Sequence, residues 1–190
     1  TLPNQMAALD AFAVVVAPSA GITQISVGDL ARVYAGEITN WSQIGGADVS
    51  VLPLKLPSES RLTQEFVSLV MEPAGKTVAG NVLTMGDPTG ISASINQFPG
   101  SISILSLSDA GPAQTVPVSG ACGIAVAPTI FHSLTGEYPL IRPIMVSYNT
   151  TTETSLPTEL FDFAVRDVAQ GLIADEGFMD QTPILQEATA

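Results

Sequence analysis

Residues 11–17 read AFAVVVA, an unbroken apolar run that Pro18 follows. A strand with one solvated face would alternate apolar and polar side chains, whereas this run is apolar on both faces. The stretch therefore predicts a β-strand that is covered on both sides, as in the interior of an α/β fold.

The next segment, residues 26–36, has the pattern of an amphipathic helix. Ser26 and Asp29 form a capping-box-like pair at its start, and Gly36 ends it. The apolar face comprises Leu30, Val33 and Tyr34. Trp41, shortly after this helix, is expected to be a packing anchor.

Strands and helices continue to alternate along the chain. We expect further strands at residues 49–56, 101–107 and 144–148, and helices at 60–71, from the Asp87 cap and Pro88 onward, and at 158–175. In the last helix Leu160, Phe161, Ala164, Val168 and Leu172 are predicted to share one side. The Pro/Gly/Ser-rich residues 111–123 are a candidate for a linker or for a crossing between two lobes. This order predicts an α/β fold with a parallel or mixed sheet.

Composition excludes several classes of protein. The chain has 190 residues, enough for one core or two small lobes, and 46% of them are hydrophobic, which argues against disorder. Its net charge of −12 excludes a basic nucleic-acid-binding face and disfavours an anionic bilayer surface. No run approaches the roughly 18–20 apolar residues of a membrane helix, so no membrane insertion is expected. No Lys or Arg precedes Arg32, so the basic start of a secretory signal is absent from this chain.

The inventory of reactive side chains argues against an enzyme. His132 is the single histidine and no GxSxG elbow occurs, so a catalytic triad is not expected. One His and one Cys exclude a His/Cys metal site, and no metal or cofactor is expected. Cys122 cannot form a disulfide within this chain. It is interpreted either as a small buried hydrophobic side chain or as the partner of a thiol elsewhere in the protein.

One segment suggests a ligand. Residues 55–61, KLPSESR, join a predicted strand to the start of a predicted helix. Free backbone N–H groups, hydroxyls and a cation at a helix start can bind an anion. The alternative is that Ser58 or Ser60 serves only as a helix N-cap. The carboxylate of Glu59 weighs against an anion.

Several motifs together resemble the phosphate-binding, type 2 periplasmic binding proteins. The most specific is ISVGDLARVYAGEITNW at 25–41, in which Gly36 and Trp41 fall in register with the family. The other motifs are LDAFAVVV at 9–16, FPGSIS at 98–103, EYPLIRP at 137–143, the 161–163 segment, Gln170-Gly171 and Gly177-Phe178. The EYPLIRP motif and the motifs from residue 161 onward are similar to the branch of the family that is fused to an outer-membrane-protein-A-like, peptidoglycan-binding domain. The likeness covers roughly residues 7–185.

The resemblance implies two α/β lobes, a two-strand hinge and a ligand between the lobes. Residues 1–18 and 111–190 would form the first lobe and residues 19–110 the second. Family members carry a further half-lobe before the first motif, so the first lobe is expected to be incomplete. The family's phosphate loop places Lys55 near its arginine, Ser58 on its serine, Glu59 on its glycine and Ser60 on its threonine. Arg61 and Asp10 complete the candidate ligand-binding residues.

The leading hypothesis is a non-catalytic domain that binds phosphate or another small anion, of the kind that serves ABC transporters or the cell envelope. The alternative is a degenerate binding-protein fold that acts as a structural or protein-interaction module. A hydrolase with a carboxylate pair is the least favoured. A bacterial periplasmic or secreted location is implied. The incomplete lobe is expected to be covered by a homodimer partner or by the missing first-lobe segment.

Overall fold

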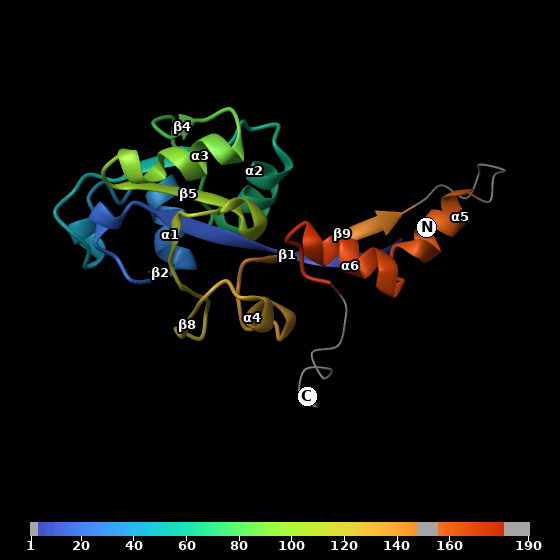
Figure 1. Cartoon of the computed structure of the whole chain (residues 1–190). Coiled ribbons are helices and arrows are strands. Elements are labelled where there is room, and N and C mark those ends of the chain that lie inside the picture. The colour runs from blue at the N-terminus through green and yellow to red at the C-terminus, as the bar shows by residue number, and fades with distance from the viewer. Residues whose placement is uncertain (1–3, 148–155, 181–190) are drawn as a thin grey trace. The chain divides into compact units, whose positions relative to one another are not determined.

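The computed structural model describes residues 4–147 and 156–180 (Figure 1). The chain divides into unit 1, Thr1–Asp10 with Ile141–Ala190, and unit 2, Ala11–Leu140. Strand β1 (Asn4–Val16) runs through the boundary between Asp10 and Ala11. The predicted lobe limits at residues 18 and 110 differ from these unit limits, and the assignment to two lobes stays a prediction.

Unit 2 contains two sheets and four α-helices. The strands after β1 are β2 (Ile25–Ser26), β3 (Leu52–Lys55), β4 (Leu83–Thr84), β5 (Ser101–Ser106), β6 (Gln114–Thr115), β7 (Val118–Ser119) and β8 (Ala125–Val126). The helices are α1 (Val27–Tyr34), α2 (Arg61–Phe66), α3 (Pro88–Ser94) and α4 (Ile130–Leu134). A π-helical stretch, Val67–Met71, continues α2, and short 3-10 turns lie at Pro18–Ala20, Trp41–Ile44, Ile95–Gln97 and Leu107–Asp109.

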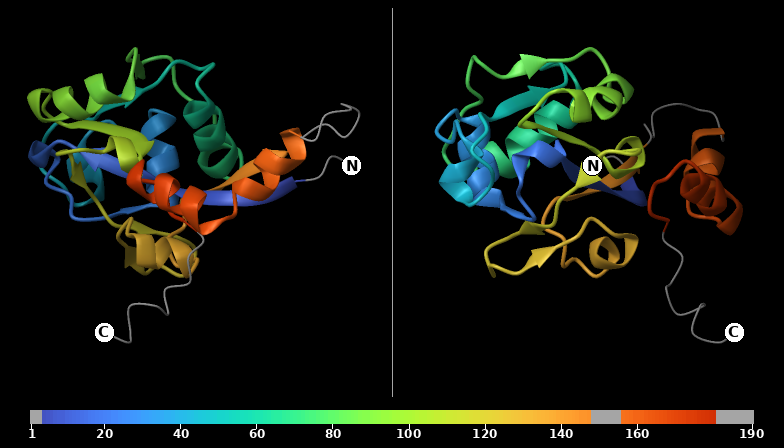
Figure 2. Two further views of the ribbon diagram at one scale, coloured as in Figure 1. Left: turned by 45° about the vertical axis from the view of Figure 1, so that its right-hand side comes forward. Right: turned by 60° about the vertical axis from the view of Figure 1, so that its left-hand side comes forward.

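The main sheet is mixed, as the alternation of elements predicts. Its strand order is β4-β3-β5-β1-β6. β3 runs parallel to both β4 and β5, whereas β1 is antiparallel to β5 and β6. The second sheet has the order β2-β7-β8. In the views of Figures 1 and 2, α4 lies on the opposite side of β1 from α3, so β1 has protein on both sides.

The apolar run of β1 forms the centre of unit 2. Residues 11–17 are all buried, which confirms the prediction of a strand covered on both sides. β5 is also buried along its whole length, although its sequence alternates serine with apolar residues. Two of its serines are tolerated because their hydroxyls donate to main-chain carbonyls, Ser101 to Ile95 O at 2.7 Å and Ser103 to Leu54 O at 3.1 Å, and the Ser106 hydroxyl pairs with that of Ser108 at 2.8 Å.

Trp41 is the anchor that the sequence predicts. Its side chain is fully buried, and its Nε1 donates to Gly100 O at 2.8 Å. Gly100 has φ +71°, and a Cβ there would lie 2.0 Å from Ser50 O. Only glycine therefore lets the segment before β5 approach the segment before β3 this closely.

Helix starts in unit 2 follow the predicted caps. The Ser26 hydroxyl accepts from Asp29 N at 2.9 Å, and Asp87 accepts from Gly90 N at 2.7 Å. Pro88 follows as the first residue of α3. These local signals need no tertiary context, which is why the sequence reveals them.

Replacing Asp87 with alanine should lower the stability of unit 2 in a pH-dependent way. Hydrogen bonds from the Thr89 side chain and from Gly90 N hold the pKa of Asp87 below its usual range. The ionised form therefore stabilises the fold above the ordinary carboxyl pKa, and this contribution is lost as the pH falls through the lowered folded value. Urea unfolding at about pH 7 and about pH 3 should show a smaller difference at the lower pH. Asp87→Ser, which keeps a capping oxygen, should not show this pH dependence.

Two interpretations of the segment after β5 are wrong. Residues 111–123 are not a bare linker, because β6 pairs with β1 and β7 pairs with β2 and β8. Cys122 is exposed rather than buried. It lies in the turn between β7 and β8, where Gly123 N donates to Gly120 O at 3.1 Å. Residues 121–124 of this turn are all exposed, so a residue type that is usually buried faces solvent here.

Unit 1 is built on the first part of β1. Strand β9 (Ile141–Ser147) pairs with β1, and Leu9 exchanges two backbone hydrogen bonds with Met179, both at 2.9 Å. The predicted strand 144–148 is thus found, beginning earlier, and its last residue lies outside the described part of the chain. Helices α5 (Leu156–Phe163) and α6 (Asp167–Asp175) complete the unit. None of the helices described in either unit has the length and apolarity that a bilayer crossing requires.

The prediction of one long helix at 158–175 is wrong. The chain leaves helical geometry at Arg166, which is extended with φ −81° and ψ 150°, and a second helix begins at Asp167. Asp167 suits that position because an acidic side chain is favourable in the first turn. Of the residues predicted to share one apolar side, Leu160, Val168 and Leu172 are exposed. Helix α6 instead turns Ala169 and Gln170 inward.

Candidate anion-binding loop

The residues 55–61 form the connection between β3 and α2. β3 lies between β4 and β5 and is parallel to both, so the loop leaves the carboxyl end of parallel strands. In open α/β sheets, ligands bind beyond the carboxyl ends of the strands. The topology thus places the loop where a ligand site is expected in such a fold.

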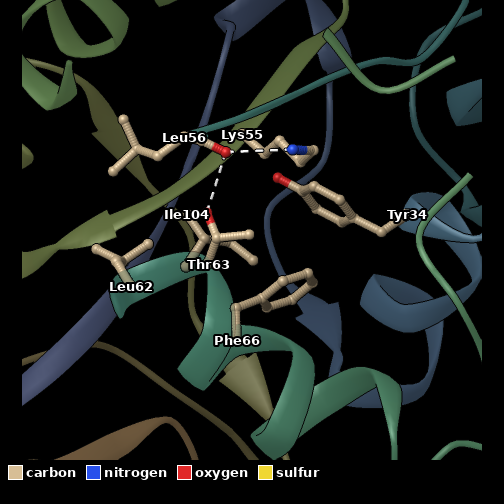
Figure 3. A pocket seen from close by; sticks show the side chains of 7 residues that line it. All are labelled: Tyr34, Lys55, Leu56, Leu62, Thr63, Phe66 and Ile104. Atoms are coloured by element: carbon tan, nitrogen blue, oxygen red, sulfur yellow. Dashed lines mark hydrogen bonds between the residues drawn. The ribbon is translucent and has the colours of Figure 1, made fainter. Parts of the chain in front are cut away.

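Lys55 and Ser58 are in direct contact. The Lys55 ammonium donates to Ser58 Oγ at 3.2 Å and to Leu56 O at 3.3 Å. Figure 3 shows that this ammonium and the Thr63 hydroxyl, which donates at 3.1 Å, both reach the Leu56 carbonyl oxygen. The buried Thr63 therefore ties the loop to α2, while the exposed Ser58 hydroxyl lies beside a cation.

Ser60 occupies the N-cap position without acting as a side-chain cap. Its hydroxyl makes no capping hydrogen bond, and the first main-chain bond of the helix runs from Gln64 N to Ser60 O at 3.0 Å. The first N–H groups of a helix have no partner within the helix and carry partial positive charge. Ser60 is therefore the N-cap residue by position, as the alternative interpretation has it, but its hydroxyl does not cap the N–H groups of the first turn.

Two charged residues of the loop do not contribute positive charge to it. The Arg61 side chain is 83% exposed, and its Nε lies 2.8 Å from Glu65 Oε1 one turn along α2. Glu59 is exposed and brings a carboxylate into the segment. Of the two predicted cations, the structure thus directs Lys55 toward the loop and Arg61 toward Glu65.

A small pocket beneath the loop is lined mainly by apolar side chains. Its lining comprises Tyr34, Lys55, Leu56, Leu62, Thr63, Phe66 and Ile104 (Figure 3). The Tyr34 hydroxyl donates to Leu54 O at 2.8 Å, and burial raises the pKa of Tyr34 far above its usual value. Tyr34 therefore stays neutral and supports the end of β3. An apolar pocket suits packing of α2 against the sheet rather than a charged ligand.

Asp10 has a structural partner in unit 1. Its side chain is 1% exposed, and Oδ2 accepts from Arg142 Nε at 2.9 Å and from Nη2 at 2.7 Å. The loop 55–61 belongs to unit 2. Sequence reasoning missed Arg142 as the partner of Asp10. The available signal was an acid within an otherwise apolar strand, because a buried carboxylate requires a compensating partner.

In the part of the chain that the structure describes, the other reactive side chains do not group into a site. His132 Nδ1 lies 3.0 Å from Thr129 Oγ1 and 3.2 Å from Ala127 O, within the turn that begins α4. Its Nε2 lies 3.8 Å from Glu137. Within residues 4–147 and 156–180, no three His, Cys, Asp or Glu side chains are grouped so that they could hold a metal ion.

Two curated proteins are similar to this chain in sequence. The phosphate-binding protein PstS of Bacillus subtilis is 26% identical over 182 residues, which is 95% of this chain and 58% of that protein. The phosphate-binding protein PstS of Borreliella burgdorferi is 23% identical over 177 residues, 90% of this chain and 63% of that protein. The chain thus spans less than two thirds of the length of either relative.

Solved structures share the fold. An ABC-type phosphate transport receptor from Vibrio cholerae superposes with a TM-score of 0.83 at 22% identity, covering 94% of this chain and 72% of that one. The PstS structure from Borrelia burgdorferi gives 0.75 at 22% identity with the same coverage. The predicted α/β class is confirmed, and the fold matches that of type 2 periplasmic binding proteins. A family model described as a PBP superfamily domain matches residues 3–168, and the chain belongs to that family.

Proposed function

We propose that this chain is a phosphate-binding or small-anion-binding domain of a substrate-binding protein, without catalytic activity. The observation that carries the proposal is the contact between Lys55 and Ser58 beside the uncapped N-terminus of α2. A cation, a hydroxyl and free N–H groups are the donors that an oxyanion requires. Their place at the carboxyl end of β3 suits a ligand site.

The relatives support the same ligand class. Both curated relatives are named as phosphate-binding proteins, and the Vibrio cholerae structure is an ABC-type phosphate transport receptor. By analogy, we propose that the chain serves an ABC transporter or the cell envelope from a periplasmic or secreted location. Asp10 is kept as a candidate residue of this protein's ligand site in addition to its pairing with Arg142.

Other features of the full protein are also proposals. The motifs in the C-terminal part support fusion to an outer-membrane-protein-A-like, peptidoglycan-binding domain. The two-lobe organisation, with residues 1–18 and 111–190 in the first lobe and 19–110 in the second, remains part of this proposal. The completion of the first lobe by an N-terminal half-lobe or by a homodimer partner is also part of this proposal.

Titration with inorganic phosphate, followed by NMR of the backbone amides, tests the site directly. We expect the chemical-shift changes caused by phosphate to concentrate at residues 58–63. Sulfate, another small oxyanion, is titrated as the matched comparison. Lys55→Ala should weaken phosphate binding at least about tenfold, because a charge-assisted hydrogen bond is lost. Glu59→Gly should strengthen it, since it removes a carboxylate and lets the backbone approach the anion.

Lys76→Ala is the matched control for Lys55→Ala. It removes the same charge, but Lys76 pairs with Glu37 outside the loop. Its phosphate affinity should therefore stay within about twofold of the unmodified chain. Equal losses of phosphate affinity in the two variants would show that the effect comes from net charge and not from the position of Lys55. Absence of shifts at 58–63 in both the unmodified chain and Glu59→Gly would refute the proposed site.

A second function is favoured by the charges of the loop. Glu59 occupies the position of the family's glycine, and Arg61 is paired with Glu65. Both features reduce the positive potential that an anion would meet. The alternative proposal is a degenerate binding-protein fold that acts as a structural or protein-interaction module. It predicts that phosphate causes no chemical-shift changes at the backbone amides. It also predicts that Glu59→Gly does not restore affinity for phosphate.

A further inference from the structure

The carboxyl end of β3 is held by side-chain hydroxyls. The Tyr34 hydroxyl donates to Leu54 O at 2.8 Å, and the Ser103 hydroxyl donates to the same oxygen at 3.1 Å. The Thr63 hydroxyl donates to Leu56 O at 3.1 Å. All three hydroxyl-bearing residues are buried, so their hydrogen bonds are shielded from water. The strand end from which the candidate anion-binding loop departs is therefore fixed by buried polar contacts.

The Leu56 carbonyl oxygen is shared between two donors (Figure 3). It accepts from Thr63 Oγ1 at 3.1 Å and from the Lys55 ammonium at 3.3 Å. A carbonyl oxygen has two lone pairs, so these two donors fill it. Thr63 is buried in α2, whereas Lys55 has a long side chain with many rotamers. The fixed hydroxyl therefore limits the direction from which the flexible lysine can reach this oxygen.

The position of the ammonium determines where the Ser58 hydroxyl hydrogen points. An ammonium carries three N–H donors and no acceptor. Among the residues that the structure describes, its acceptors are Leu56 O and Ser58 Oγ, the latter at 3.2 Å, so one N–H is left for a ligand. Because Ser58 accepts there, its own hydrogen is directed away from Lys55. The pair thus presents one N–H and one O–H to a ligand with acceptor oxygens.

We propose that Thr63 is a positioning residue of the anion-binding site. Its hydroxyl keeps the Lys55 ammonium between Leu56 O and Ser58 Oγ, so that Lys55 and Ser58 donate to the same oxyanion. Without this hydroxyl, one lone pair of Leu56 O loses its donor. A buried carbonyl oxygen that is short of donors attracts the nearby cation and draws Lys55 away from Ser58. The inference rests on the proposed function, because it names a residue that supports the same site.

Thr63→Val is the decisive variant. It keeps the shape of the side chain and the net charge, and it replaces the hydroxyl with a methyl group. Isothermal titration calorimetry with inorganic phosphate should show an affinity about fivefold weaker than that of the unmodified chain. Thr63→Ser keeps the hydroxyl, and its phosphate affinity should stay within about twofold of the unmodified chain.

Ser92→Ala is the matched control for the loss of a buried hydroxyl. Ser92 Oγ donates to Ala110 O at 2.6 Å, where α3 meets Ala110 rather than in the loop. Urea unfolding should show that this variant is destabilised, but its phosphate affinity should stay within about twofold of the unmodified chain. General loosening of the fold would instead weaken phosphate binding in Ser92→Ala and Thr63→Val alike.

A double-mutant cycle with Lys55→Ala identifies the route of the effect. If Thr63 acts through the ammonium, Thr63→Val should change phosphate affinity by less than about twofold once Lys55 is replaced. A purely structural role would give the same loss with and without Lys55. A second readout needs no ligand: the NMR resonances of the Lys55 side chain at Cε and Nζ should shift in Thr63→Val and stay unchanged in Ser92→Ala.

The outcomes separate this inference from the proposed function. If phosphate binds neither the unmodified chain nor any variant, the proposed function fails, and the Lys55 resonances alone decide whether Thr63 positions the ammonium. The inference is overturned if Thr63→Val binds phosphate as tightly as the unmodified chain, or if Thr63→Ser loses as much affinity as Thr63→Val. Unmoved Lys55 resonances in Thr63→Val would overturn it as well.

Discussion

Replacement of Trp41 by alanine should lower the free energy of unfolding by about 4 kcal/mol. The indole is completely buried, so its removal leaves a large cavity between the segments that precede β3 and β5. It also removes the hydrogen bond from Nε1 to Gly100 O. Because Trp41 is the single tryptophan, unfolding in urea should be followed by far-ultraviolet circular dichroism rather than by tryptophan fluorescence.

Trp41→Phe separates the two contributions. It keeps an aromatic ring but leaves Gly100 O without the indole donor, and should cost roughly half as much as the alanine variant. Leu52 N still donates to the same oxygen at 3.0 Å, so this carbonyl is not left wholly unpaired. A loss below about 1 kcal/mol in Trp41→Ala would show that the segments collapse into the space.

The second large effect is expected at Arg142. Arg142→Ala should destabilise the chain by about 3 kcal/mol, because it removes the guanidinium from a carboxylate that is 1% exposed. Urea unfolding measures the loss, and hydrogen exchange at the Leu9 and Met179 amides should show whether it is confined to unit 1. Arg166→Ala removes an exposed cation of the same unit and should change stability by less than about 0.5 kcal/mol.

A double variant tests whether burial of the charge causes the loss. Asp10→Asn with Arg142→Met removes both charges and should recover a substantial part of the stability that Arg142→Ala loses. If the double variant is no more stable than Arg142→Ala, the unpaired buried charge of Asp10 is not the cause of the loss.

Local signals account for what the sequence could predict of the fold. The Asp87 cap and the Ser26–Asp29 pair depend on neighbours three residues apart. The run of β1 that is apolar on both faces requires burial wherever the strand lies. The connection between β3 and α2 could be predicted in the same way, and its Lys55–Ser58 contact joins residues only three positions apart. The pairing of Arg61 with Glu65 was also readable from its four-residue spacing on a helix.

Features that depend on distant parts of the chain could not be predicted. Asp10 and Arg142 are 132 positions apart, and nothing local indicates that they meet. The apolar residues of 158–175 were predicted to share one side of a helix, and such periodicity reports amphipathicity and not what covers that side. Only the structure shows that Gln170 takes the inner side and leaves Val168 outside.

The division of β1 between the units has a consequence for synthesis on the ribosome. Residues 12–16 of this strand find their neighbours in β5 and β6. Residues 4–10 must wait for β9 and for Met179, which follow later in the sequence than β5 and β6. The nascent chain therefore carries an unsatisfied strand segment at residues 4–10 until β9 and Met179 have been made. Such an edge is a substrate for chaperones and a starting point for aggregation, and slowing translation should increase both.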